Sequence, residues 1–110
     1  MDIEESLRGN AVILKPSGRL DSSSTSIMQD RVQATMARRP KHLVIDFTAV
    51  DYVNSTGLRV MLMAAKKMKL DGGRLTLCGM KPNVREVFVI SGFHKIIEIV
   101  DECAGLTGAA

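Results

Sequence analysis

The sequence has few of the residues on which many binding and catalytic sites depend. It contains no tryptophan, one tyrosine and three phenylalanines, so its 110 residues offer few aromatic rings for stacking nucleic-acid bases. Its two histidines, His42 and His94, and its two cysteines, Cys78 and Cys103, are too few and too scattered for a typical zinc site. We therefore expect no metal site, no cofactor and no nucleic-acid partner.

Long apolar runs are also missing. No run approaches the ~20 residues that a membrane helix needs, and the acidic start MDIEESLRG lacks the apolar centre of a secretory signal. We therefore expect a cytoplasmic protein without membrane contact. In that setting Cys78, which lies in a strand-like run, is expected to be a buried thiol.

The composition that remains is that of an ordinary globular protein. Hydrophobic residues make up 45% of the chain and charged residues 25%, with a formal net charge of +3. A chain of this length forms one domain, residues 1–110, in which we expect the tail 104–110 to fray. Basic residues cluster at 38–41 and 66–74, where solvated helix ends explain them better than a nucleic-acid groove.

The first third of the sequence predicts a hairpin followed by a helix. Strands are expected over 3–8 and 11–15, joined by a turn at Gly9-Asn10, with Pro16 ending the second strand. A helix capped by one of residues 21–24 follows and stops before Pro40. Its apolar positions recur at helical spacing and are Ile27, Met28, Val32 and Met36.

The middle of the chain predicts a buried strand and a long helix. Residues 43–45 form a short apolar run typical of a strand covered on both faces, and residues 48–53 are expected to form a turn. A helix then begins at Asn54 and ends at 71–73 with the sequence Asp-Gly-Gly. Its predicted core face consists of Leu58, Met61, Leu62, Ala65 and Met68, with Val60 and Met63 on the flanks.

The last third predicts two further strands around one helix. A strand is expected over 74–78, a helix from Pro82 to Gly92 with Val84, Val87 and Phe88 in the core, and a strand over 96–100. Asp101 is expected to cap a final helical turn. Helices between successive strands imply parallel pairing, so the predicted fold is α/β: a mixed, mostly parallel sheet with an N-terminal antiparallel hairpin, packed with α-helices.

Three segments resemble the signature of the STAS domain. Residues 46–58, DFTAVDYVNSTGL, resemble its central motif around Ser-Ser/Thr-Gly-Leu. Residues 18–21, GRLD, resemble the family's Gly-x-Leu-Asp at the end of the second strand, and residues 72–77 resemble its later Gly-Gly-x-Leu-x-Leu. The resemblance covers essentially the whole chain and implies a STAS-like fold.

Short STAS proteins are similar to bacterial anti-sigma factor antagonists, so the resemblance implies a phosphorylation-controlled regulator and not an enzyme. Ser55 matches the serine that a GHKL-type kinase, itself the anti-sigma factor, phosphorylates and that a PP2C-type phosphatase restores. Asp21 matches an acidic position near that serine, and Thr56 is the second candidate acceptor. By this resemblance the unphosphorylated form, a monomer or weak dimer, binds the anti-sigma factor and phosphorylation releases it.

Elementary electrostatics supports a phosphate at this position. The start of a helix offers unpaired N–H groups and the positive end of a dipole, so the fold tolerates the phosphate while its charge disrupts a docked interface. Gly57 is expected to leave the backbone open to a kinase, Leu58 to be core, and Val60 and Met63 to be either core or contact surface. The predicted partner-binding residues are Asp21, Asn54, Ser55, Thr56, Gly57, Leu58, Val60 and Met63.

Two departures and two rival functions accompany this prediction. Asn54 stands where the family usually has Asp, and the chain is basic, with a pI of about 9.1, whereas many relatives are acidic. A hydrolase with Ser55 as nucleophile is disfavoured, because Gly-x-Ser-x-Gly is absent and neither histidine is well placed as a base. A stand-alone STAS sensor of nucleotides or anions is the alternative, although the sequence has no Walker motif.

Overall fold

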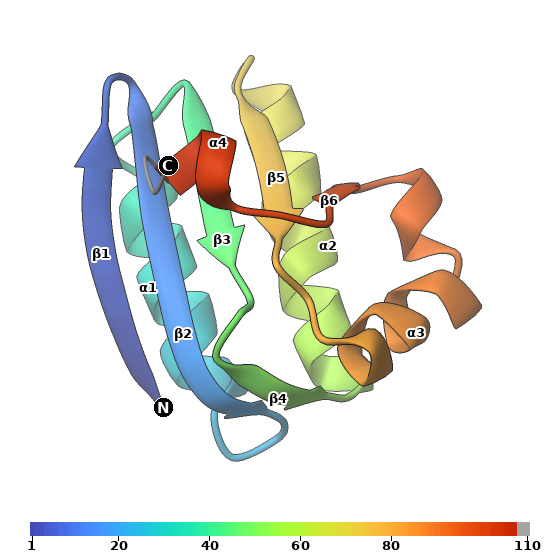
Figure 1. The fold of residues 1–110 in the computed structure, drawn as a ribbon. Helices are drawn as coiled ribbons and strands as arrows, with labels where there is room; N and C mark the ends of the chain where they lie inside the picture. Colours follow the sequence, from blue (N-terminus) through green and yellow to red (C-terminus); the bar gives the residue numbers. More distant parts are fainter. Residues whose placement is uncertain (108–110) are drawn as a thin grey trace.

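The structure is a computed structural model that describes residues 1–107 (Figure 1). The strands are β1 (Asp2–Arg8), β2 (Ala11–Leu20), β3 (His42–Asp46), β4 (Val50–Val53), β5 (Arg74–Cys78) and β6 (Glu98–Val100). The helices are α1 (Thr25–Met36), α2 (Ser55–Leu70), α3 (Pro82–Ile90) and α4 (Ala104–Thr107), with the 3-10 turn η1 (Phe93–Lys95).

The strands form one mixed sheet. Its order is β1-β2-β3-β5-β6, with β4 beside the far end of β2. β1 and β2 pair antiparallel and every other pair is parallel. The predicted fold class, a mostly parallel sheet with an N-terminal antiparallel hairpin, is therefore confirmed.

Two sequence predictions about β2 and β4 are wrong. β2 does not end at Pro16 but continues to Leu20, and residues 50–53 form a strand where a turn was expected. β2 pairs with β3 through residues 11–14 and with β4 from Gly18 onward, so Pro16 lies in the gap between the two partners, where a missing N–H is tolerated. Gly18, at φ 105°, makes the irregular step onto β4, a conformation that favours glycine.

Helices α1 and α2 lie side by side against one face of the sheet (Figure 1). The strand residues facing them, such as Leu14, Ile45 and Leu77, are fully buried. The buried apolar residues of α2 are Leu58, Val60, Met61, Ala64 and Met68. The predicted core face was wrong at Leu62 and Ala65, which are only half-buried, because the buried stripe passes through Ala64 and takes in Val60.

Helix α3 closes the core at the end of the sheet where β4 lies (Figure 1). Val84 and Phe88 are fully buried, and the Phe88 ring meets Phe47 edge-on with 5.9 Å between ring centroids. Val87, which was also predicted to be core, is half-buried. The last strand is shorter than predicted and begins at Glu98.

The C-terminal segment corrects the expectation for the cysteines. Cys78 is not a free thiol: it forms a disulfide with Cys103, which is 25 residues away in sequence. Asp101 does not cap α4, which starts at Ala104; its carboxylate instead accepts a hydrogen bond from Arg85 at 2.9 Å. Of the tail expected to fray, residues 104–107 form α4 and residues 108–110 lie outside the described residues.

Between residues 1 and 107, none of the helices combines the length and the hydrophobicity that crossing a bilayer requires.

Candidate functional site

The predicted site lies where β2 and β4 end and α2 begins. The two strands are parallel, so their carboxyl ends, at Leu20 and Val53, reach the same edge of the sheet. The Asn54 N–H donates to the Leu20 carbonyl at 3.2 Å and joins the start of α2 to the end of β2. Asp21 and Asn54 consequently line one shallow surface pocket, which brings two distant sequence motifs together.

Asn54 is the N-cap of α2. Its extended backbone, at φ −115° and ψ −173°, directs the side-chain Oδ1 at the first turn of the helix. That oxygen accepts hydrogen bonds from the Thr56 N–H at 3.1 Å, the Gly57 N–H at 3.2 Å and the Thr56 hydroxyl at 2.6 Å. Capping is therefore performed by the asparagine and not by Ser55.

The Ser55 side chain is left exposed at the first position of the helix. Across residues 1–107, no described hydrogen bond involves its hydroxyl, whereas the neighbouring Thr56 hydroxyl is held by Asn54. The expectation that a phosphate here meets several unpaired amides needs correction, because Asn54 already occupies two of them. The favourable end of the dipole of a 16-residue helix remains.

Gly57 has a structural role that the sequence analysis missed. We expected it to open the backbone to a kinase, but the residue is buried against the ends of β2 and β4. A Cβ atom at this position would come within 2.8 Å of both Leu20 Cγ and Val53 Cγ2. Glycine is therefore required for the close approach of the α2 start to the sheet.

Asp21 organises the turn that follows β2. Its Oδ1 accepts hydrogen bonds from the Ser23 hydroxyl at 2.6 Å and the Ser23 N–H at 3.0 Å, while Arg19 Nε donates to Oδ2 at 3.2 Å. The two Ser23 bonds, followed by the Arg19 bond and charge, lower the pKa of Asp21. The buried Ser24 hydroxyl donates to the Arg19 carbonyl, so it closes this turn and does not cap α1.

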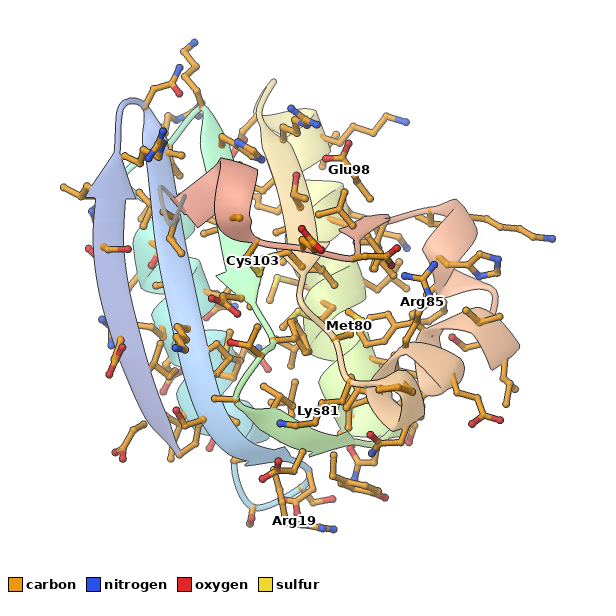
Figure 2. All side chains as sticks on the ribbon, viewed as in Figure 1. Arg19, Met80, Lys81, Arg85, Glu98 and Cys103 are labelled. Carbon is orange, nitrogen blue, oxygen red and sulfur yellow. A yellow bond between two sulfur atoms is a disulfide. The ribbon has the colours of Figure 1, made fainter. Side chains whose placement is uncertain are left out.

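Arg19 and Tyr52 add a cation–π pair beside the site. The Arg19 guanidinium carbon lies 4.2 Å from the centroid of the Tyr52 ring, so β2 and β4 present a positive charge held in place by an aromatic face. Arg19 lies at the sheet edge where β2 turns toward α1 (Figure 2). Both residues line the same pocket as Asp21 and Asn54.

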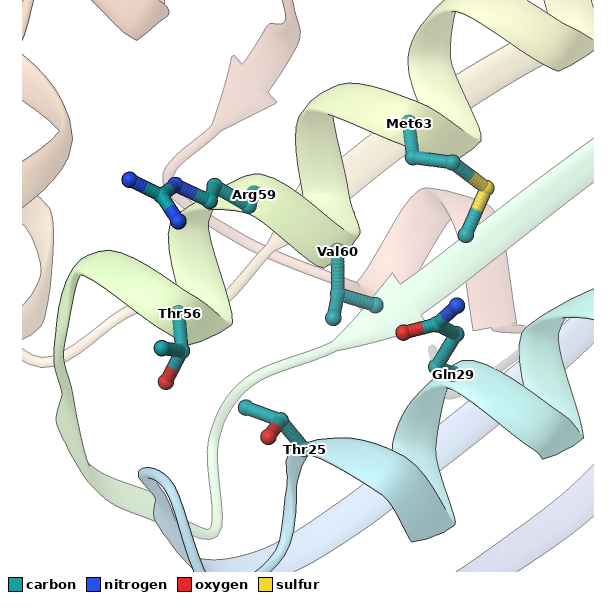
Figure 3. Close-up of a pocket in the computed structure, with 6 residues that line it drawn as sticks. All are labelled: Thr25, Gln29, Thr56, Arg59, Val60 and Met63. Atoms are coloured by element: carbon teal, nitrogen blue, oxygen red, sulfur yellow. The ribbon is translucent and has the colours of Figure 1, made fainter.

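A groove runs between α1 and α2 from the Ser55 end of α2. Its first section has a volume of about 380 Å³ and is lined by Thr25 and Gln29 of α1 and by Thr56, Arg59, Val60 and Met63 of α2 (Figure 3). Val60 forms part of the buried wall, whereas Met63 is half-buried and lines the next section as well. The basic residues along this groove, here called the helix groove, are Arg39, Arg59 and Lys67.

The structure divides the predicted partner-binding residues into two groups. Ser55 is exposed, and Asp21, Asn54, Thr56 and Met63 are partly exposed. Gly57, Leu58 and Val60 are buried, with Leu58 only 7% exposed, so they shape the surface from beneath. The alternative left open for Val60 is decided in favour of the core.

Three surface residues near the site were not predicted: Arg19, Tyr52 and Arg59. Arg59 could have been found from sequence, because Thr56, Arg59 and Met63 recur at spacings of three and four on one helical face. Arg19 and Tyr52 carry no such signal. Their contact depends on the pairing of Arg19 with Tyr52 across β2 and β4.

The two histidines do not assemble a catalytic base at Ser55. His42 begins β3, at the end of the sheet opposite to the α2 start, and its Nε2 lies 2.8 Å from the Thr76 hydroxyl. Burial, followed by the charge of Arg74, lowers the pKa of His42. His94 lies in η1 and is exposed.

One cluster of potential metal ligands is present among the described residues. The ligand atoms of Asp46, Cys78 and Cys103 lie within 4.8 Å of one another. The two sulfur atoms are bonded to each other, so neither is available as a thiolate. In its oxidised form this cluster cannot hold a metal in the manner of a cysteine site.

Comparison with known proteins identifies relatives of the chain. The profile of the STAS domain family matches residues 2–105. The chain is 37% identical over 84 residues to BtrV of Bordetella bronchiseptica, named as a proposed anti-sigma factor antagonist, over 76% of this chain and 72% of BtrV. It is 28% identical over 102 residues to the anti-sigma F factor antagonist of Paenibacillus polymyxa, over 92% of this chain and 87% of that protein.

Solved structures show the same fold. The chain superposes on the anti-sigma factor antagonist SpoIIAA in its unphosphorylated form with a TM-score of 0.78 and 18% identity, over 99% of both chains. The phosphorylated form of the Bacillus protein gives a TM-score of 0.73 and 16% identity, over 99% of this chain and 100% of that one. At these identities the likeness establishes the fold alone.

Proposed function

Because the chain belongs to the STAS domain family, we propose that it is an anti-sigma factor antagonist whose binding to an anti-sigma factor is controlled by phosphorylation of Ser55. The family resemblance expected from residues 18–21 and 46–58 is confirmed by the family match. The names of BtrV and of the Paenibacillus protein support the regulatory role. The kinase is expected to be of the GHKL type and the phosphatase of the PP2C type, both cytoplasmic.

The observation that carries the proposal is the free hydroxyl of Ser55. Asn54 performs the capping that a serine at a helix start commonly performs, so Ser55 has no described structural task. Its side chain is exposed, whereas the Thr56 hydroxyl is bonded to Asn54. A kinase can therefore modify Ser55 without breaking a contact of the fold, which makes Ser55 the better acceptor of the two.

Phosphorylation changes the surface without opposing the fold. A phosphate adds about −1.5 to −2 of charge at the positive end of α2, where the dipole favours it. The same charge lies at the mouth of the helix groove, next to Thr56. If a partner docks over this surface, burial of the unpaired charge costs several kcal/mol, which is enough to dissociate a micromolar complex.

The helix groove extends the docking surface beyond the serine. It combines the apolar, partly exposed Met63 with the cations Arg39 and Arg59, and we propose that the anti-sigma factor presents acidic and apolar side chains to it. A partner of that charge is repelled by phosphoserine. The basic character of the chain then contributes to the switch.

The test is phosphorylation in vitro with a GHKL-type kinase, to be sought first among the neighbouring genes. Incubation with ATP is expected to add one phosphate, mapped to Ser55 by tandem mass spectrometry, and to release the kinase from the protein. Ser55→Ala is expected to prevent phosphorylation and retain binding, while the matched variant Thr56→Val is phosphorylated normally. Phosphate on another residue, or Ser55→Asp binding the kinase as tightly as the wild type, contradicts the proposal.

The alternative, a sensor of nucleotides or anions, has less support from the geometry. An anion at the start of α2 needs free amides, and the Asn54 side chain already occupies those of Thr56 and Gly57. Titration calorimetry with ATP and GTP distinguishes the two functions. If the purified protein binds ATP or GTP at the Ser55 end of α2 in the absence of any protein partner, the sensor function is favoured.

A further inference from the structure

The C-terminal segment crosses the face of the sheet opposite to α1 and α2. After β6 the chain passes in front of β5 and β3 and forms the single turn of α4 (Figure 1). The disulfide joins Cys103 in this segment to Cys78, the last residue of β5 (Figure 2). Cys78 is fully buried, whereas Cys103 is only half-buried.

Beneath the segment lies a small second core. Ile13, Val44 and Cys78 are buried together, and Val100 and Cys103 pack against them. Ile13 pairs with Val44 in the sheet register, and both alternate along their strands with residues of the main core. Their side chains therefore point to the opposite face, where the C-terminal segment covers them.

Few other contacts hold residues 101–107 in place among those described. The Arg85–Asp101 ion pair is at the surface, where such pairs contribute little. α4 has four residues, too few for a helix that is stable by itself. β6 has three residues and is the edge of the sheet. The disulfide is thus the main link between this segment and the sheet.

From these contacts we infer that Cys78–Cys103 is a reversible thiol–disulfide site that controls whether the C-terminal segment covers Ile13 and Val44. Its reaction partner is a small thiol such as glutathione. Cys103 is half-buried and Cys78 is fully buried, so the Cys103 sulfur is the more accessible point of attack and Cys78 is the leaving group. The inference does not depend on the proposed switch at Ser55.

The exchange balances in two steps. A glutathione thiolate attacks Cys103 Sγ, the Sγ–Sγ bond breaks, and the Cys78 thiolate that leaves takes up the proton lost by glutathione. A second glutathione attacks the mixed disulfide, which releases Cys103 as a thiol and forms glutathione disulfide. The protein gains two electrons and two protons, and two glutathione molecules are oxidised. In the reduced protein the segment detaches and the apolar side chains beneath it become accessible.

The test is a redox titration of the whole chain. The protein is equilibrated in buffers of increasing reduced-to-oxidised glutathione ratio with a chelator present, so that reduced Cys78, Cys103 and Asp46 do not capture zinc. Alkylation and mass spectrometry give the fraction of disulfide. Hydrogen exchange on the same samples reports residues 98–107 and the strands that carry Ile13 and Val44.

We expect the disulfide to be reduced reversibly at the glutathione ratio of the cytosol. Amide hydrogen exchange in residues 98–107 is then expected to be on the order of tenfold faster, with the exchange of α2 unchanged. In the Cys103→Ser variant, residues 98–107 are expected to exchange at the fast rate at every glutathione ratio. Unchanged protection of α2 in this variant verifies that the variant is folded. A disulfide that stays closed throughout, that opens with no change in exchange, or whose opening unprotects α2 as well overturns the inference.

Discussion

Asn54 and Ser55 divide two tasks that a single residue often performs at the start of a helix. The amide side chain caps α2, and the hydroxyl is left exposed for the proposed chemistry. The asparagine where the family usually has aspartate is compatible with this division, because a carbonyl oxygen caps as well as a carboxylate. Unlike aspartate, Asn54 also places no negative charge beside a phosphate on Ser55.

Asn54→Asp is expected to affect the two phosphorylation states differently. In the unphosphorylated protein the new carboxylate keeps the cap and meets the helix dipole, raising the free energy of unfolding by about 0.5 kcal/mol. In the phosphorylated protein the carboxylate repels the phosphate, so the gain disappears or reverses. Urea denaturation of both forms measures the difference, and Asn54→Ala, which loses the cap, should cost about 1 kcal/mol in each. An equal gain in both forms contradicts this account.

Gly57→Ala tests the close packing beneath the same turn. The added methyl group would lie 2.8 Å from Leu20 Cγ and Val53 Cγ2, so the net loss of stability is expected to be about 1–2 kcal/mol despite the better helix propensity of alanine. Ser55→Ala is the matched control on the exposed side of the turn and is expected to change stability by less than about 0.5 kcal/mol. Equal stabilities, measured by urea denaturation, would show that the turn relaxes freely.

At the scale of elements, the helix groove depends on how α1 and α2 pack. The two helices contact each other, and the groove between them begins next to the proposed phosphorylation site. The cations of the helix groove come from α2 and from Arg39 just beyond α1, so their common surface is a product of the packing.

Arg59→Glu is expected to weaken binding of the anti-sigma factor about tenfold, because it reverses a charge at the mouth of the groove facing a proposed acidic partner. Lys95→Glu in η1 makes the same change of charge at another exposed position and is expected to leave the dissociation constant nearly unchanged. Surface plasmon resonance at two ionic strengths gives both values. Equal losses for the two variants would indicate a nonspecific effect of net charge.

At the scale of the whole molecule, the two faces of the sheet bury very different numbers of apolar residues. One carries the main core under α1 and α2, and the other carries the small cluster of Ile13, Val44 and Cys78 under the C-terminal segment. The second face also holds a polar row in which Thr76 donates to Glu98 and His42 Nε2 lies 2.8 Å from the Thr76 hydroxyl. Arg74 donates to both carboxylate oxygens of Glu98.

This row predicts that the protein loses stability on acidification. The pKa of His42 is lowered from 6.5 by burial and then by Arg74, so below about pH 6.5 the unfolded chain binds a proton that the folded chain resists. The pKa of Glu98 is lowered by the bonds from Arg74 and then Thr76, so its stabilising contribution is present above its ordinary value of 4.5 and is lost as pH falls through its folded pKa. Both effects therefore lower the free energy of unfolding in acid.

Denaturation in urea across a pH series measures this loss. His42→Gln keeps a donor for Thr76 but does not titrate, so it is expected to remove the early part of the loss, which begins near pH 6.5, and to keep the later part due to Glu98. If His42→Gln follows the wild-type curve throughout, another group is responsible.

The sequence by itself determined the features that local physics encodes. Alternation and apolar runs predicted most strands, helical spacing predicted α1, α2 and α3, and turn chemistry predicted where α2 starts and stops. The motif around Ser55 predicted the family, because its residues are contiguous in the chain. These signals act within about one or two turns of backbone and need no knowledge of the neighbours in space.

Only the tertiary structure decided what depends on segments far apart in sequence. β4 and the second half of β2 are strands because each offers the other a partner, which neither Pro16 nor residues 48–53 could reveal. The disulfide, the Arg19–Tyr52 pair and the exclusion of Gly57 and Val60 from the surface likewise follow from sheet register and helix packing. The physical reason is that burial and pairing are properties of the folded neighbourhood, which a local pattern constrains but does not specify.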